Sequence, residues 1–119
     1  YLSNRTIEKA QILVNLFEEL EVVDWGVLPD FDMIINATSL GLKENDKFGI
    51  DFSTIKSNKL FFDVIYNPFN TDFSEAGNKP GNTIENGLNM FLFQAQKAFS
   101  IWHNFEPKID QEVIKFLEG

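Results

Sequence analysis

The sequence predicts an α/β domain built on a short parallel sheet. Residues 31–38 and 60–66 are apolar runs that end in polar residues, a pattern typical of strands buried on both faces of a parallel sheet. Residues 7–20 carry apolar side chains at close to a 3.6-residue period, which indicates a helix. Helices and strands that alternate in this way are typical of parallel α/β layers.

Local signals place the N-terminal elements. Thr6 is a suitable N-cap for the first helix, and Glu8 puts a negative charge in its first turn, where the helix dipole favours one. We expect this helix over residues 7–20, a connection over residues 21–30 and a buried strand over residues 31–38.

The rest of the chain is expected to complete the alternation. The strand at 60–66 is stopped by Asn67 and Pro68. Asp110 is a suitable cap for a last helix. The other expected elements are a short helix at 71–76, a brief strand at 81–85, and helices at 86–102 and 111–118.

Composition narrows the classes of function. The chain has 119 residues, 44% of them hydrophobic, enough for the core of about one domain. Its net charge of −8 argues against nucleic acid as a partner, because phosphate backbones need basic surfaces. The absence of cysteine and the single histidine, His103, exclude disulfides and any Cys-based or multi-His metal site, and we expect no metal.

Targeting signals are also missing from the sequence. No apolar run reaches the roughly 18–20 residues of a membrane span, and no secretion signal is visible. We therefore expect a cytoplasmic protein with no membrane partner. The chain begins at Tyr1 rather than methionine, which suggests that it is incomplete.

Polar residues gather where strands are expected to end. These stretches are residues 3–6, residues 36–39, and Tyr66 with Asn67. In open α/β sheets, ligands bind in the crevice beyond the carboxyl ends of the strands. The three stretches together favour a ligand site at this edge, with the Tyr66 hydroxyl as a polar handle. The alternative is an ordinary core or surface tyrosine.

Two cations stand at the start of the first helix. Arg5 and Lys9 are four residues apart, which places them on one face of the first turn. The free N–H groups of a helix N-terminus also favour anions. This arrangement suits a phosphate monoester such as the 2′-phosphate of NADP. The alternative is a capped helix with solvated cations.

The expected helix at 86–102 carries a second candidate pair. Gly87 and Gln94 are seven residues apart, or two turns along one face. Gly87 would let a flat ring approach the backbone. Gln94 stands among apolar residues and needs a hydrogen-bonding partner. Alternatively, Gln94 bonds the protein backbone and Gly87 relieves crowding.

Four motifs follow one another along the chain. They are Asn4-Arg5-Thr6 with Lys9-Ala10, FDMIINATSLG at residues 31–41, DVIYNP at residues 63–68 with Thr71, and NGLNM at residues 86–90 with Gln94-Ala95. In this order and spacing they resemble the cofactor domain of the shikimate dehydrogenase family, and the resemblance covers essentially the whole chain.

The resemblance implies a partial Rossmann-like fold, with three αβα layers and a short parallel sheet. Residues 1–119 would be an incomplete NADP-binding domain plus C-terminal helices. The intact enzyme would be an oxidoreductase that reduces 3-dehydroshikimate to shikimate with NADPH, a step of aromatic amino-acid biosynthesis.

The resemblance also implies roles for single residues. The residues that match the family's adenosine-phosphate motif are Asn4, Arg5, Thr6 and Lys9. Val64 and Gly87 match positions beside the nicotinamide, and Tyr66 and Gln94 match positions that contact the substrate. Thr38 and Ser39 match a loop near the cofactor. The family often has arginine where Lys9 stands, and lysine keeps the charge but loses the planar fork.

Parts of the family pattern are not found in the chain. The family's catalytic lysine and aspartate belong to an N-terminal substrate domain, and its glycine-rich pyrophosphate loop precedes the Asn-Arg-Thr motif. We therefore expect no catalytic residue among residues 1–119 and no dehydrogenase activity from this chain alone. A sheet without its first strands exposes edges and apolar faces, so we also expect self-association, swapping of elements between copies or only marginal stability.

Two alternatives remain open at this point. One is a quinate/shikimate dehydrogenase that uses NAD, although Arg5 with Lys9 favours NADP. The other is a non-catalytic ligand-binding domain on the same scaffold.

Overall fold

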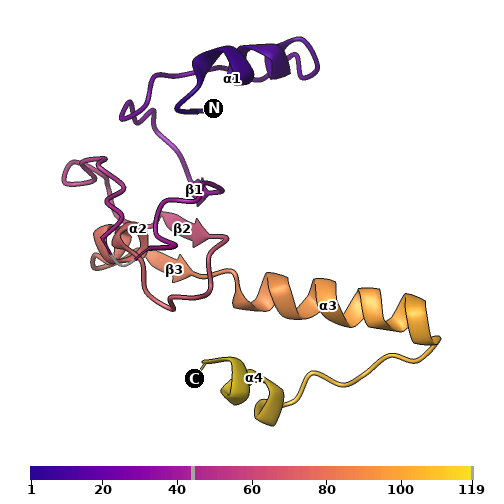
Figure 1. Cartoon of the computed structure of the whole chain (residues 1–119). Helices are drawn as coiled ribbons and strands as arrows, with labels where there is room; N and C mark the ends of the chain where they lie inside the picture. The colour runs from indigo at the N-terminus through magenta and orange to yellow at the C-terminus, as the bar shows by residue number, and fades with distance from the viewer. Residues whose placement is uncertain (44, 119) are drawn as a thin grey trace.

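The computed structural model describes residues 1–43 and 45–118 of the chain. Its elements are α1 (Ile7–Val14), β1 (Met33–Asn36), β2 (Leu60–Asp63), α2 (Asp72–Gly77), β3 (Thr83–Glu85), α3 (Leu88–His103) and α4 (Gln111–Glu118). The strands form a parallel sheet in the order β1-β2-β3 (Figure 1). The α/β class and the short parallel sheet are therefore confirmed.

Both strands with apolar runs are shorter than the sequence predicts, and a side chain ends each of them. β1 stops at Asn36, whose Oδ1 accepts a hydrogen bond from the Thr38 N–H at 3.0 Å. β2 stops at Asp63, whose Oδ1 accepts one from the Ile65 N–H at 3.0 Å. Asn and Asp side chains compete with the sheet for backbone donors in this way.

The first helix is also shorter than predicted, because α1 ends at Val14 and not at residue 20. Residues 15–20 continue in turns, in which the Leu20 N–H donates to the Phe17 carbonyl oxygen at 3.0 Å. Leu16 and Phe17 are exposed. Most of the stability of a helix in a protein comes from packing of its apolar face. Leu16 and Phe17 make no such packing, so the helix does not continue through them.

The C-terminal elements agree closely with the prediction. α3 ends at His103, and its C-cap Asn104 adopts a left-handed conformation with φ 49°. The Asp110 Oδ1 accepts from the N–H groups of Glu112 and Val113, so its predicted role as the cap of α4 is confirmed. Thr71 caps α2 and forms a reciprocal capping box with Ser74.

The core is a cluster of four buried phenylalanines on the sheet. They are Phe48, Phe52, Phe61 and Phe73. The rings of Phe48 and Phe73 lie 4.8 Å apart, and Trp25 packs on Phe48 at 5.2 Å. The connection between β1 and β2 supplies Phe48 and Phe52, so it covers part of the sheet. α2 packs against β2 and β3.

Several elements lie outside this core. α1 stands apart from the sheet, and α3 projects away from it (Figure 1). Leu2 pairs with Val22 in an isolated parallel bridge, whereas β1 pairs with β2. Large apolar side chains are left exposed, among them Trp102 at 77% and Phe116 at 85%. Across the described residues, no helix has the length and apolar character of a membrane span.

Candidate functional site

The carboxyl ends of β1 and β2 meet at one edge of the sheet. Asn36 and Asp63 are register partners in the parallel pair, and the Asn36 Nδ2 donates to the Asp63 Oδ1 at 3.0 Å. Both side chains are 1% exposed. The loops that carry Thr38 and Tyr66 leave the sheet from this buried pair. Two of the three polar stretches that the sequence predicts at one edge therefore meet there, whereas residues 3–6 do not, because Leu2 pairs only with Val22 in an isolated bridge away from this sheet.

The loop after β1 is held by its own side chains. The Thr38 hydroxyl donates to the Asn36 Oδ1 at 2.7 Å and accepts from the Leu40 N–H at 3.1 Å. The Asn36 Nδ2 also donates to the Leu40 carbonyl oxygen at 3.1 Å. Thr38 therefore shapes the loop, while Ser39 beside it is exposed.

The start of α3 lies directly against the end of β2. The Gly87 N–H donates to the Ile65 carbonyl oxygen at 3.1 Å. A Cβ added at Gly87 would fall on the carbonyl oxygen of Val64. Gly87 has an ordinary φ of −74°, so space and not backbone conformation requires glycine here. Relief of crowding, one of the two interpretations offered by the sequence, therefore accounts for this residue.

Tyr66 is fixed by α3. Its ring stacks on Phe91 with centroids 4.7 Å apart and planes at 23°. Val64, Tyr66 and Gly87 are thus brought together where β2 and α3 meet. Gln94 lies one turn beyond Phe91 on the same helix.

Gln94 differs from the expectation in its surroundings. The sequence predicts an amide packed among apolar side chains, but Gln94 is exposed, because this part of α3 projects beyond the sheet (Figure 1). The neighbouring Gln96 makes the protein contact instead and donates to the Pro107 carbonyl oxygen at 2.7 Å.

The N-terminal group lies on a separate part of the molecule. Arg5 and Lys9 are exposed at the start of α1, and neither forms an ion pair within the described residues. Thr6 occupies the N-cap position as predicted, but in the described structure its side chain makes no capping hydrogen bond. The Asn4 Oδ1 accepts from the Thr6 N–H at 3.4 Å. Two cations and unused N–H groups are therefore open to an anion.

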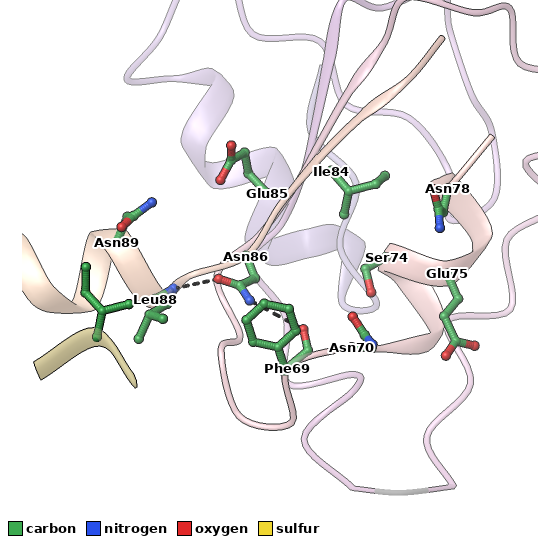
Figure 2. A pocket seen from close by; sticks show the side chains of 11 residues that line it. Phe69, Asn70, Ser74, Glu75, Asn78, Ile84, Glu85, Asn86, Leu88 and Asn89 are labelled. Carbon is green, nitrogen blue, oxygen red and sulfur yellow. Dashed lines mark hydrogen bonds between the residues drawn. The ribbon is translucent and has the colours of Figure 1, made fainter. Parts of the chain in front are cut away.

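A cavity of about 510 Å³ lies beside the start of α3, and Figure 2 shows its lining. At its centre, the Asn86 Nδ2 donates to the Phe69 carbonyl oxygen at 3.4 Å, and the Asn86 Oδ1 accepts from the Leu88 N–H at 3.1 Å. Among the described residues, the lining contains none of the predicted site residues, so this cavity is distinct from the predicted site. Within the same residues, no group of His, Asp and Glu side chains is placed to hold a metal ion.

The sequence is similar to curated shikimate dehydrogenases. The chain is 52% identical over 118 residues to the shikimate dehydrogenase (NADP(+)) of Pelagibacter ubique (strain HTCC1062), and the alignment covers 99% of this chain. The chain corresponds to one part of a shikimate dehydrogenase. It spans 44% of the length of that relative. No protein-family model matches it.

Solved structures agree with this assignment to shikimate dehydrogenase. A crystal structure of a shikimate dehydrogenase in complex with NADP⁺ matches with a TM-score of 0.79 and 30% identity, over 98% of this chain and 44% of that one. The ligand-free 5-ketofructose reductase of Gluconobacter sp. strain CHM43 matches with a TM-score of 0.78 and 28% identity, over 98% and 45% of the two chains. A reductase named for another substrate thus shares the backbone, so the fold alone does not assign the substrate.

Sequence reasoning did not recognise the buried partners in this candidate site. The Asp63 carboxylate accepts a backbone hydrogen bond from the Ile65 N–H. Its bonds to the side chains of Asn36 and Thr71 were not foreseen. The available signal was a polar residue inside each apolar run, Asn36 and Asp63, in positions that the parallel register aligns.

Proposed function

We propose that this chain supplies the NADP-binding side of a shikimate dehydrogenase. The whole protein would reduce 3-dehydroshikimate to shikimate with NADPH, in the cytoplasm and as a step of aromatic amino-acid biosynthesis. The observation that carries the proposal is the 52% identity to a shikimate dehydrogenase (NADP(+)) over 99% of this chain, which includes every candidate site residue. Residues 1–119 would then be an incomplete NADP-binding domain followed by C-terminal helices.

The start of α1 fits the 2′-phosphate of NADP. Arg5 and Lys9 are exposed and carry no protein counter-ion among the described residues. Helix N-termini add unused N–H donors and partial positive charge for an anion. Asn4 and Thr6 complete this group. A cofactor without the 2′-phosphate more often meets an acidic residue in this region of the fold, so the cations favour NADP over NAD.

The junction of β2 and α3 would hold the nicotinamide end of NADPH and one side of the substrate. Val64 and Gly87 would lie beside the nicotinamide, and Tyr66 and Gln94 would donate hydrogen bonds to oxygens of the substrate. When NADPH is bound, its nicotinamide supplies the hydride for carbonyl reduction. The Phe91 stack keeps the Tyr66 ring in one orientation, which supports a positioning role, since reaction rates depend steeply on placement.

These residues orient ligands but provide no general acid. Tyr66 and Gln94 are placed as hydrogen-bond donors, and none of the residues assigned here has a proton-transfer role. The proton for the reduced oxygen would come from a part of the enzyme outside residues 1–119. The chain alone is therefore expected to be inactive.

A chimeric enzyme tests the proposal. Residues 1–119 replace the matched segment of the Pelagibacter ubique relative, and NADPH oxidation is followed with 3-dehydroshikimate. We expect turnover by the chimera and none by the isolated chain. A folded chimera without turnover, beside an active parent enzyme, would contradict the proposed function.

A further inference from the structure

One buried carboxylate joins three segments of the site. The Asp63 Oδ1 accepts from the Asn36 Nδ2 at 3.0 Å and from the Ile65 N–H at 3.0 Å. The Asp63 Oδ2 accepts from the Thr71 hydroxyl at 2.5 Å. These donors belong to the end of β1, the loop after β2 and the N-cap of α2. Asp63 is 1% exposed, so it does not reach a ligand itself.

Each partner of Asp63 holds a further piece of backbone. Asn36 fixes the loop after β1 through Thr38 and Leu40. The Thr71 hydroxyl accepts from the Ser74 N–H at 3.2 Å, and the Ser74 Oγ accepts from the Thr71 N–H at 2.9 Å. A change at Asp63 is therefore transmitted to two loops and one helix start.

Tyr66 lies inside the segment that Asp63 closes. Ile65 and Thr71 are both bonded to the same carboxylate, so the chain between them is tied at both ends. Ile65 also accepts from the Gly87 N–H, which links this segment to the start of α3. The position of the Tyr66 ring against Phe91 depends on these ties.

We propose that Asp63 is a positioning residue that holds the loops after β1 and β2 and the cap of α2 as one unit, and thereby fixes Tyr66 and the Val64–Gly87 contact for hydride transfer. The proposal rests on the proposed function, because it assigns Asp63 a role in that reaction. It concerns geometry and involves no proton transfer by Asp63.

The chemistry of the carboxylate explains why an amide cannot replace it. Asp63 accepts three hydrogen bonds and donates none. In Asp63→Asn, one of the two carboxylate oxygens becomes an NH₂ group. This group either faces a hydrogen-bond donor, or the Thr71 hydroxyl must rotate so that its oxygen accepts from the NH₂ group. At least one buried partner then loses its present acceptor, and the loops shift. Misplacement of reacting groups by about 1 Å lowers rates roughly 100-fold.

The first test is kinetic and uses the chimeric enzyme. We expect Asp63→Asn to lower kcat by roughly 10- to 100-fold, with the KM for NADPH within about twofold of the parent value, because the phosphate-binding cations lie on α1. Asp30→Asn is the matched control, since Asp30 is exposed and pairs with Lys59 before the start of β2. It should behave as the unchanged chimera.

A second pair of variants tests the proposal even if Asp63→Asn does not fold. Thr71→Ser keeps the hydroxyl that donates to Asp63 and is expected to retain activity. Thr71→Val has nearly the same volume but removes that donor, and it should lower kcat with little change in the KM for NADPH. Equal activity of the two Thr71 variants would overturn the proposal, whether or not Asp63→Asn folds.

Hydrogen exchange gives a readout that is independent of turnover. In Asp63→Asn we expect faster amide exchange at residues 37–41 and 64–71 together, and no change in Asp30→Asn. Faster exchange in one of these loops alone would refute the single-unit arrangement. If the chimera is inactive but both loops exchange faster in Asp63→Asn, the proposed function is contradicted and the single-unit arrangement stands. If the chimera is active and Asp63→Asn has the same kcat as Asp30→Asn, the positioning role of Asp63 is refuted.

Discussion

Single side chains decide which positive charges remain available to a ligand. Lys47 and Lys59 are already engaged, with Asp72 at 2.8 Å and Asp30 at 3.1 Å. Arg5 stands exposed before the first turn of α1 and forms no ion pair among the described residues. In an acidic chain of net charge −8, its guanidinium therefore remains available to an anionic group.

Arg5→Ala in the chimeric enzyme tests this assignment. Loss of a charged hydrogen bond of about 1.5–3 kcal/mol should weaken NADPH binding by roughly 10- to 100-fold, and NADH binding much less. Dissociation constants from nucleotide fluorescence titrations would measure both. Lys115→Ala removes an exposed charge from α4 and serves as the control. Equal losses for the two nucleotides would rule out recognition of the 2′-phosphate.

Gly87→Ala is expected to destabilise the chain through overpacking. The new Cβ would fall on the Val64 carbonyl oxygen, and relief requires a backbone shift that costs roughly 1–3 kcal/mol. Urea unfolding followed by circular dichroism would measure the loss. Asn89→Ala, at an exposed position on the same helix, should leave stability within about 0.5 kcal/mol. A Gly87→Ala chain as stable as Asn89→Ala would show that the contact is not restrictive.

At the scale of elements, Asp72, the first residue of α2, links this helix to the segment between β1 and β2. The Asp72 carboxylate accepts from the Lys47 ammonium and from the Phe48 N–H, both at 2.8 Å. The Lys47 hydrogen bond, followed by that of Phe48, holds the pKa of Asp72 below its usual value of 3.8. Lys47 is largely exposed and its charge is screened by water, so the Phe48 N–H is the better shielded donor.

This lowered pKa makes stability depend on pH. The unfolded chain protonates Asp72 more readily than the folded chain does, so the contribution of Asp72 is present above about pH 4 and is lost as the pH falls further. We expect Asp72→Asn to be less stable than the parent near neutral pH and to lose less stability on acidification. Urea midpoints measured at several pH values would check this. Parallel pH profiles would contradict it.

Sequence signals at this scale located the elements better than their ends. The helix expected at 86–102 agrees with α3 to within two residues, and the Asp110 cap placed the start of α4, because capping is a local signal. The ends of β1 and β2 depend on where the side chains of Asn36 and Asp63 find donors, which follows from the register between strands distant in sequence. Gln94 is exposed because α3 projects beyond the sheet, and no local pattern encodes that.

At the scale of the whole molecule, many large apolar side chains are exposed on the described surface. Exposed side chains include Phe93, Ile101, Trp102 and Phe116, and β1 is an edge of the described sheet. The chain spans less than half the length of curated relatives that it matches. Large exposed apolar patches mark interaction sites or promote association, and open sheet edges add to this tendency.

The isolated 119-residue chain is therefore expected to self-associate. Light scattering after size exclusion should give a mass that rises with protein concentration. Trp102→Ser with Phe116→Ser should reduce the effect, while Asn89→Ser, an exposed polar substitution, should not. A concentration-independent monomer with high thermal stability would contradict this prediction.

The two tryptophans of the chain sit in contrasting environments. Trp25 packs on Phe48 at the edge of the aromatic cluster and is 37% exposed, whereas Trp102 is 77% exposed near the end of α3. Their fluorescence emission should therefore differ, with Trp102 contributing the red-shifted component. In a Trp102→Phe chain, the remaining emission would report on melting of the core, and in a Trp25→Phe chain it would shift to the blue when α3 becomes covered. The sequence thus contains separate intrinsic optical probes for folding and for assembly.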